Sequence, residues 1–96
     1  MPDLFRELEQ TLQARKRDRP EGSYTVTLLD DTELAQRKIM EEAFELCLEL
    51  GRTTHDSDPE RIAEEAADLI YHTLVGLVSA GVSLDAIEQV LQSRQR

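Results

Sequence analysis

Apolar residues recur every three or four positions through most of this sequence, in four segments separated by turn-forming residues. The segments are residues 4–17, 32–50, 59–80 and 84–91. This spacing is typical of amphipathic helices. Pro20 and Gly22 follow the first segment, Gly51 follows the second and Gly81 follows the third, where such residues end helices. The sequence therefore predicts an all-α fold, a compact bundle of four main helices.

The residues that precede three of these segments suit helix N-termini. Asp3, Asp58 and Ser83 can each accept a hydrogen bond from a backbone N–H of the first helical turn. Pro59 directly follows Asp58, and proline is favoured at the first helical position. We therefore expect helices that begin directly after these three residues.

Residues 23–29 are the segment with the most strand-like composition, being rich in β-branched and aromatic side chains. The chain offers no second strand to pair with it, and a lone strand is not stable. We expect either an extended segment lying against the helices or a short helical turn that Ser23 or Thr25 caps. Hydroxyls and free backbone N–H groups at such a turn suit phosphate oxygens.

The length and the charge of the chain limit its function. Ninety-six residues can bury one core, so residues 1–96 are expected to form one domain. Acidic residues outnumber basic ones by 20 to 11, for a net charge of −9, which disfavours binding to nucleic acid. Cys47 is the only cysteine, so no intrachain disulfide is possible, and its apolar neighbours predict a buried thiol. We see no signal peptide and no apolar run long enough for a membrane span, so we expect a cytoplasmic protein.

Two of the predicted helices carry acidic residues one turn apart on a single face. Glu42 and Glu45 lie on the first of them, and Glu65 and Asp68 on the second. At about 100° per residue, each pair and its charged neighbours fall within an arc of about 60°. Like charges at this spacing repel each other. If the two faces meet, the repulsion grows as water is excluded.

A cation between the two faces would remove this repulsion. Oxygen ligands without cysteine or paired histidine favour Mg²⁺, with Mn²⁺ or Ca²⁺ as alternatives. A substrate with a diphosphate or triphosphate would complete the coordination, and a metal-activated water could attack phosphorus while a spare carboxylate takes its proton. The residues alone leave two other interpretations open. The acids could be two ordinary solvated faces, or the chain could be a non-enzymatic acidic helical module that binds a basic partner.

Three short motifs stand in and around these acids. They are Ser23-Tyr24-Thr25, then Lys38 with Glu41-Glu42-Ala43 and Glu45, then Glu64-Glu65-Ala66-Ala67-Asp68-Leu69-Ile70-Tyr71-His72. Together they resemble the phosphoribosyl-ATP pyrophosphohydrolases, which belong to the MazG-like all-α nucleotide pyrophosphohydrolases. The resemblance covers residues 4 to about 91. It departs from the family pattern at Asp31, where a glycine is frequent.

The resemblance implies hydrolysis of phosphoribosyl-ATP to phosphoribosyl-AMP and pyrophosphate, the second step of histidine biosynthesis. It implies Mg²⁺, or Mn²⁺, as the cofactor. The ligands would be Glu42, Glu45, Glu65 and Asp68, with Glu41 as an outer carboxylate or base. The substrate contacts would come from Lys38, Ser23, Tyr24, Thr25 and, as a phosphate contact, Arg15.

The same resemblance implies a homodimer in which both subunits build each site. The apolar surface that a single short chain leaves uncovered points to self-association as well. One alternative is a housekeeping member of the superfamily that hydrolyses free nucleoside triphosphates with the same metal chemistry. Two residues also stay open: His72 as a ligand or a structural residue, and Arg61 as no more than a partner for Glu65 one turn away.

Overall fold

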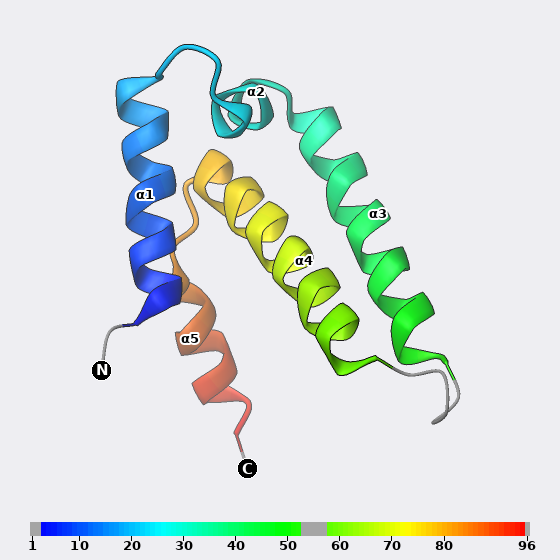
Figure 1. Cartoon of the computed structure of the whole chain (residues 1–96). Coiled ribbons are helices and arrows are strands. Elements are labelled where there is room, and N and C mark those ends of the chain that lie inside the picture. Colours follow the sequence, from blue (N-terminus) through cyan, green and yellow to red (C-terminus); the bar gives the residue numbers. More distant parts are fainter. Residues whose placement is uncertain (1–2, 53–57, 96) are drawn as a thin grey trace.

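The computed structural model describes residues 3–52 and 58–95, and the regular elements in these ranges are all helices (Figure 1). They are α1 (Leu4–Asp18), α2 (Tyr24–Asp30), α3 (Thr32–Leu50), α4 (Pro59–Ala80) and α5 (Leu84–Ser93). The all-α prediction is confirmed. The additional helix is α2, because the segment predicted as extended or as a short helical turn is helical, and Ser23 is its N-cap.

Side-chain caps determine where these helices begin. The three predicted caps, Asp3, Asp58 and Ser83, each accept a hydrogen bond from a backbone N–H of the first turn. Asp31 does the same for α3, which gives this residue a structural role. Gly81 ends α4 with a φ of 76°, a left-handed conformation that glycine adopts without strain.

Helix α4 is the centre of the arrangement. It contacts α1, α2 and α3, and Figure 1 shows it between α1 and α3, with α2 across one end. The helices α3 and α4 run antiparallel, and they approach closely at Gly76, where a Cβ atom would lie 3.4 Å from Cδ1 of Ile39. The apolar core lies between α1, α2 and the C-terminal half of α4, and its buried members are Leu12, Leu28, Leu74, Val75 and Val78.

The protomer is more open than the compact bundle that the sequence predicts. Its radius of gyration is 15.1 Å, whereas a compact chain of this length would have about 12.5 Å. Helix α5 leaves α4 at an angle of 104° and contains no buried residue. On α3, the side chains of Met40, Phe44 and Leu48 are more than half exposed. Cys47 is exposed on the same helix, so the prediction of a buried thiol is wrong for the single chain.

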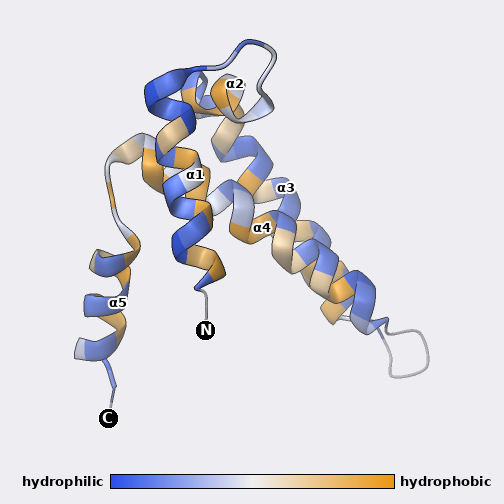
Figure 2. Cartoon of the chain, turned by 60° about the vertical axis from the view of Figure 1, so that its left-hand side comes forward, coloured by the Kyte–Doolittle hydropathy of each residue, from blue (hydrophilic) through white to orange (hydrophobic). Residues whose placement is uncertain are grey.

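Hydrophobic stretches recur along α3, α4 and α5 (Figure 2). No single helix of the described ranges is long and apolar enough to cross a membrane, and α4 and α5 pass such a test only as a bent pair. Residues 53–57, between the second and third predicted helical segments, lie outside the described ranges.

Candidate active site

Three carboxylates come together where α3 faces α4. Glu42 and Glu45 come from α3 and Glu65 from α4, and each offers an oxygen within 4.8 Å of the other two. Glu42 and Glu45 share a face because they are one turn apart, and the packing of α4 on α3 brings Glu65 next to them. In the described part of the chain, no other three potential metal ligands lie this close together.

Two of these acids each have one buried oxygen without a described hydrogen-bond partner. Glu42 is 7% exposed and the Glu65 side chain 12%, and Oε2 of each is buried with no hydrogen-bond partner among the described residues. Burial raises the pKa of Glu42, and repulsion from Glu45 and Asp68 raises it further. Burial also raises the pKa of Glu65, and a hydrogen bond with Glu45 raises it further. Buried oxygens of this kind are costly unless a cation binds them, and an all-carboxylate group fits a hard divalent ion such as magnesium.

The other predicted members of the acidic site lie at its edge. Asp68 is exposed on α4 and stands outside the group of three, although its charge acts on Glu42. Lys38 Nζ lies 3.1 Å from Oε2 of Glu41 and 3.9 Å from Oε1 of Glu42. The hydrogen bond with Glu41 is the main cause of a raised pKa of Lys38. The structure therefore brings together three of the four predicted ligands, while Glu41 contacts Lys38.

Two hydroxyl groups of α2 contact α4. The Tyr24 hydroxyl lies 3.0 Å from Nε2 of His72, and the Thr25 hydroxyl is hydrogen-bonded to that of Tyr71. Nδ1 of His72 lies 2.8 Å from the carbonyl oxygen of Asp68. A carbonyl can only accept, so Nδ1 donates to it, and the neutral ring then accepts from Tyr24 at Nε2. Both ring nitrogens of the buried His72 thus have protein partners, which supports its structural interpretation.

The two remaining predicted substrate contacts lie at helix ends. The Ser23 hydroxyl accepts a hydrogen bond from the backbone N–H of Val26. Arg15 is exposed in the last turn of α1, and within the described ranges no hydrogen bond or ion pair joins it to the three acids. The hydroxyls of Ser23, Tyr24 and Thr25 therefore all have partners within the chain.

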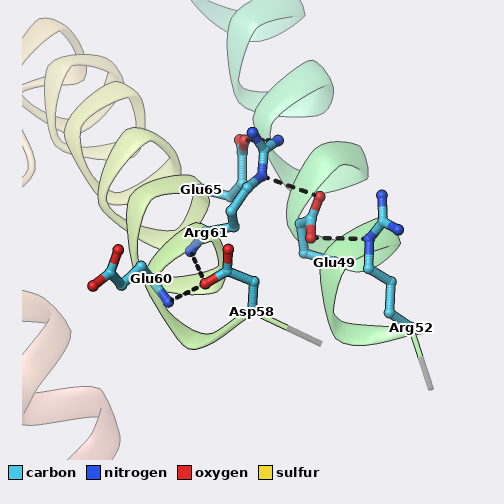
Figure 3. Close-up of polar contacts among 6 residues, drawn as sticks. All are labelled: Glu49, Arg52, Asp58, Glu60, Arg61 and Glu65. Atoms are coloured by element: carbon cyan, nitrogen blue, oxygen red, sulfur yellow. Dashed lines mark hydrogen bonds and ion pairs between the residues drawn. The ribbon is translucent and has the colours of Figure 1, made fainter. Parts of the chain in front are cut away.

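A second polar cluster lies next to Glu65, at the end of α3 and the start of α4 (Figure 3). Its centre is Glu49 of α3, which is 6% exposed. Nε of Arg52 lies 3.0 Å from Oε2 of Glu49, and Nε of Arg61 lies 3.5 Å from Oε1. Nη2 of Arg61 also lies 3.5 Å from Oε1 of Glu65. The predicted pair between Arg61 and Glu65 is confirmed, and Arg61 therefore links the two clusters.

The contact between Glu49 and Arg61 escaped the sequence-based reasoning because it joins two helices. A signal for it exists in the sequence: Glu49 lies in the same arc of α3 as Glu42 and Glu45, one turn further along. Glu49 is buried, and a buried acid that is not a metal ligand needs a basic partner.

Comparison with known proteins identifies the family. Residues 5–95 match the sequence model of the phosphoribosyl-ATP pyrophosphohydrolase family. The phosphoribosyl-ATP pyrophosphatase of Caulobacter vibrioides (strain NA1000 / CB15N) is 40% identical over 95 residues, which are 99% of this chain and 85% of that protein. The phosphoribosyl-ATP pyrophosphatase of Halobacterium salinarum (strain ATCC 29341 / DSM 671 / R1) is 35% identical over 95 residues, 99% of this chain and 100% of that protein. The histidine biosynthesis trifunctional protein of Neurospora crassa is 49% identical over 87 residues, which are 91% of this chain but 9% of that protein. The chain belongs to the phosphoribosyl-ATP pyrophosphohydrolase family.

Proposed function

We propose that this chain hydrolyses phosphoribosyl-ATP to phosphoribosyl-AMP and pyrophosphate, the second step of histidine biosynthesis, in the cytoplasm. Membership of the family over residues 5–95 supports the substrate. The Caulobacter and Halobacterium relatives, which match along most of their length, are named phosphoribosyl-ATP pyrophosphatases. The observation that carries the chemistry is the group of three carboxylates in which two buried oxygens have no described partner.

Magnesium, with manganese as the second choice, would be held by the acids that face each other across α3 and α4. The proposed ligands are Glu42, Glu45, Glu65 and Asp68. When bound, a divalent cation lowers the pKa of a coordinated water and neutralises phosphate charge. Lys38 lies between Glu41 and Glu42, where it reduces the repulsion among the acids and can hold a phosphate oxygen. Glu41 is the proposed outer carboxylate, because its contact with Lys38 keeps it out of the ligand group.

The nucleotide would extend from the acids toward α2. Its proposed contacts are Ser23, Tyr24 and Thr25, with Arg15 as a phosphate contact. The hydroxyls of Tyr24 and Thr25 now bind His72 and Tyr71 of α4. The Tyr24 hydroxyl, which donates to His72, could therefore donate to a phosphate oxygen only by exchanging this partner, although its oxygen can still accept a hydrogen bond.

A homodimer would explain the open protomer. Exposed apolar side chains on α3 include Met40, Phe44 and Leu48. A cavity of about 390 Å³ with apolar residues such as Ile39 and Leu77 in its wall lies between the N-terminal part of α3 and the C-terminal half of α4. A second copy of the chain is the proposed occupant, since exposed apolar surface of this kind marks an interface. Light scattering should give the mass of a dimer, and Phe44→Glu should shift it toward that of a monomer.

Pyrophosphate release from phosphoribosyl-ATP, compared with release from a panel of free nucleoside triphosphates, tests the proposed activity. We expect phosphoribosyl-ATP to be hydrolysed fastest. Glu65→Gln should abolish turnover and the binding of Mn²⁺ measured by electron paramagnetic resonance. Its matched control is Glu64→Gln, which removes the exposed neighbouring acid and should leave both unchanged. Turnover of free triphosphates alone would refute the proposed substrate in favour of the housekeeping alternative. Absence of any turnover would instead favour the interpretation as a non-enzymatic acidic helical module that binds a basic partner.

A further inference from the structure

We infer that Arg52 and Arg61, which both contact Glu49, form the subsite for the terminal phosphates of the triphosphate, which leave as pyrophosphate. The inference rests on the proposed function, because it needs a cation and a triphosphate at the neighbouring acids. Both arginines line a cavity of about 360 Å³ together with Glu45 and Glu65, two of the three grouped acids. The whole wall consists of Glu45, Leu48, Glu49, Arg52, Arg61 and Glu65. A ligand in this cavity would thus contact the arginines and the proposed metal site together.

Glu49 serves as the anchor of the subsite and is not a further ligand. Its side chain is 8% exposed, and each of its oxygens has an arginine partner. The arginine side chains themselves are about half exposed, at 51% for Arg52 and 55% for Arg61. The two guanidinium groups outweigh the single charge of Glu49. The whole cavity wall has three carboxylates and two arginines, so a divalent cation bound at Glu45 and Glu65 would give the cavity a net positive charge. Guanidinium groups match phosphate oxygens in geometry and in charge.

Arg61 is weakly held in its present position. Its contacts with Glu49 and with Glu65 are both 3.5 Å long, beyond the usual range of a charge-assisted hydrogen bond. In this arrangement Arg61 partly neutralises Glu65. A cation that binds Glu65 would remove the need for this contact, and Arg61 could then donate to a phosphate at the same site. Arg52, with a 3.0 Å hydrogen bond to Glu49, would move less.

A purely structural role makes a different prediction. If the arginines only reduce the repulsion among the acids, removing them would lower stability and leave the affinity for pyrophosphate unchanged. The two roles can therefore be distinguished by measuring the binding of a phosphate ligand and the binding of a metal ion independently.

The experiment compares Arg61→Gln, Arg61→Lys and Arg52→Gln with the full wild-type chain. Arg94→Gln, at the C-terminal end of α5, is the control for the loss of one positive charge. Inorganic pyrophosphate is the probe, measured by calorimetry on the Mg²⁺-loaded protein and as a product inhibitor of phosphoribosyl-ATP hydrolysis. Binding of Mn²⁺ without any phosphate is followed by electron paramagnetic resonance.

We expect Arg61→Gln to weaken pyrophosphate binding about tenfold to a hundredfold, the scale of a lost charge-assisted contact. Arg52→Gln should have a smaller effect, and Arg61→Lys an intermediate one, because lysine keeps the charge but not the planar fork. Binding of Mn²⁺ should stay unchanged or tighten, and Arg94→Gln should behave as wild type.

Pyrophosphate affinity equal to that of wild type in both glutamine variants would overturn the subsite while leaving the proposed function intact. Loss of Mn²⁺ binding in Arg61→Gln would also overturn it, because Arg61 would then act through the metal site. A wild-type chain that neither binds Mn²⁺ nor hydrolyses phosphoribosyl-ATP would overturn the proposed function and the subsite together.

Discussion

The two halves of α4 are stabilised in opposite ways. The C-terminal half places Leu74, Val75 and Val78 in the apolar core, none of them more than 6% exposed. The N-terminal half places Glu65 against Glu42 of α3, and each has a buried oxygen without a described partner. The C-terminal half is stabilised by apolar packing within the chain. The other contains charges that a bound cation would satisfy better than the protein does.

This difference separates stability from function along a single helix. The apolar half fixes α1 and α2 on α4 and can offset the cost of an acidic site about two turns away. His72 lies at the junction, where its ring is bonded to Tyr24 of α2 and to the backbone of Asp68. Substitutions in the two halves should therefore change different quantities, and the following predictions test this from the largest expected effect to the smallest.

Leu28→Ala should have the largest effect on stability. Leu28 is fully buried in the core, and truncating a buried leucine costs about 3 kcal/mol because a cavity remains. Urea unfolding at a fixed protein concentration measures the loss. The folded variant should bind Mn²⁺ as wild type does, because Leu28 packs against the apolar half of α4, whereas the three grouped carboxylates lie on α3 and in the N-terminal half of α4. Leu4→Ala is the control, since the Leu4 side chain is 72% exposed, and equal losses in the two variants would contradict the proposed core.

Tyr24→Phe tests the junction between the halves. It removes the hydroxyl that donates to His72 and leaves a buried ring nitrogen without its partner, at a cost of about 1–2 kcal/mol. Thr27→Val is the control, because the exposed Thr27 hydroxyl bonds only a carbonyl of its own helix turn, and we expect little change. KM for phosphoribosyl-ATP should rise as well, because Tyr24 is a proposed substrate contact, and unchanged stability would contradict the role of the hydrogen bond with His72.

Glu42→Gln should raise stability in the absence of metal, which is the reverse of the effect in the apolar half. The substitution keeps the size of the side chain and removes a buried charge that Glu45 and Asp68 repel, a gain of roughly 1 kcal/mol. Unfolding with a chelator measures this gain, and excess Mg²⁺ should stabilise wild type but not the variant. Glu41→Gln, at an exposed position paired with Lys38, should stay near wild type under both conditions. A loss of stability in chelator would mean that the Glu42 charge is already compensated by the protein.

The periodicity of the sequence was sufficient to predict most of the fold. It located α3 and α4, and the caps at Asp58 and Ser83 were correct because capping depends on residues within one turn. It left the conformation of residues 23–29 undecided, because β-branched residues favour a strand when the surroundings are unknown. In the structure this segment is the helix α2, which contacts α1, α3 and α4. It placed Cys47 in the core, because an apolar helix face does not reveal whether the same chain covers it.

The candidate site was predictable to the extent that it depends on one helix at a time. The spacing of Glu42 and Glu45 put them on one face, and the approach of Glu65 followed from pairing two such faces. The contacts of Glu49 with Arg61, and of Tyr24 with His72, cross between helices. They depend on the position of one helix along the axis of its neighbour, and the periodicity of the sequence does not determine this position. The sequence was therefore sufficient to group three of the four acids and to pair Arg61 with Glu65 one turn away, but not to find the contacts that join different helices.

The smallest effect concerns α5, which belongs to neither half of the comparison. Its first backbone N–H, from Leu84, donates to Oε2 of Glu9 at 2.8 Å, so a buried acid of α1 binds the positive end of this helix. Glu9→Gln keeps an acceptor oxygen and removes the charge, so it should cost about 0.5 kcal/mol, and Glu9→Leu should cost more because it removes the acceptor. Amide hydrogen exchange at Leu84 measures the opening of this contact. If exchange there were as slow in Glu9→Leu as in wild type, the position of α5 would depend on other contacts. The hydrogen bond would then serve to satisfy the buried carboxylate of Glu9 and would not be needed to hold α5 in place.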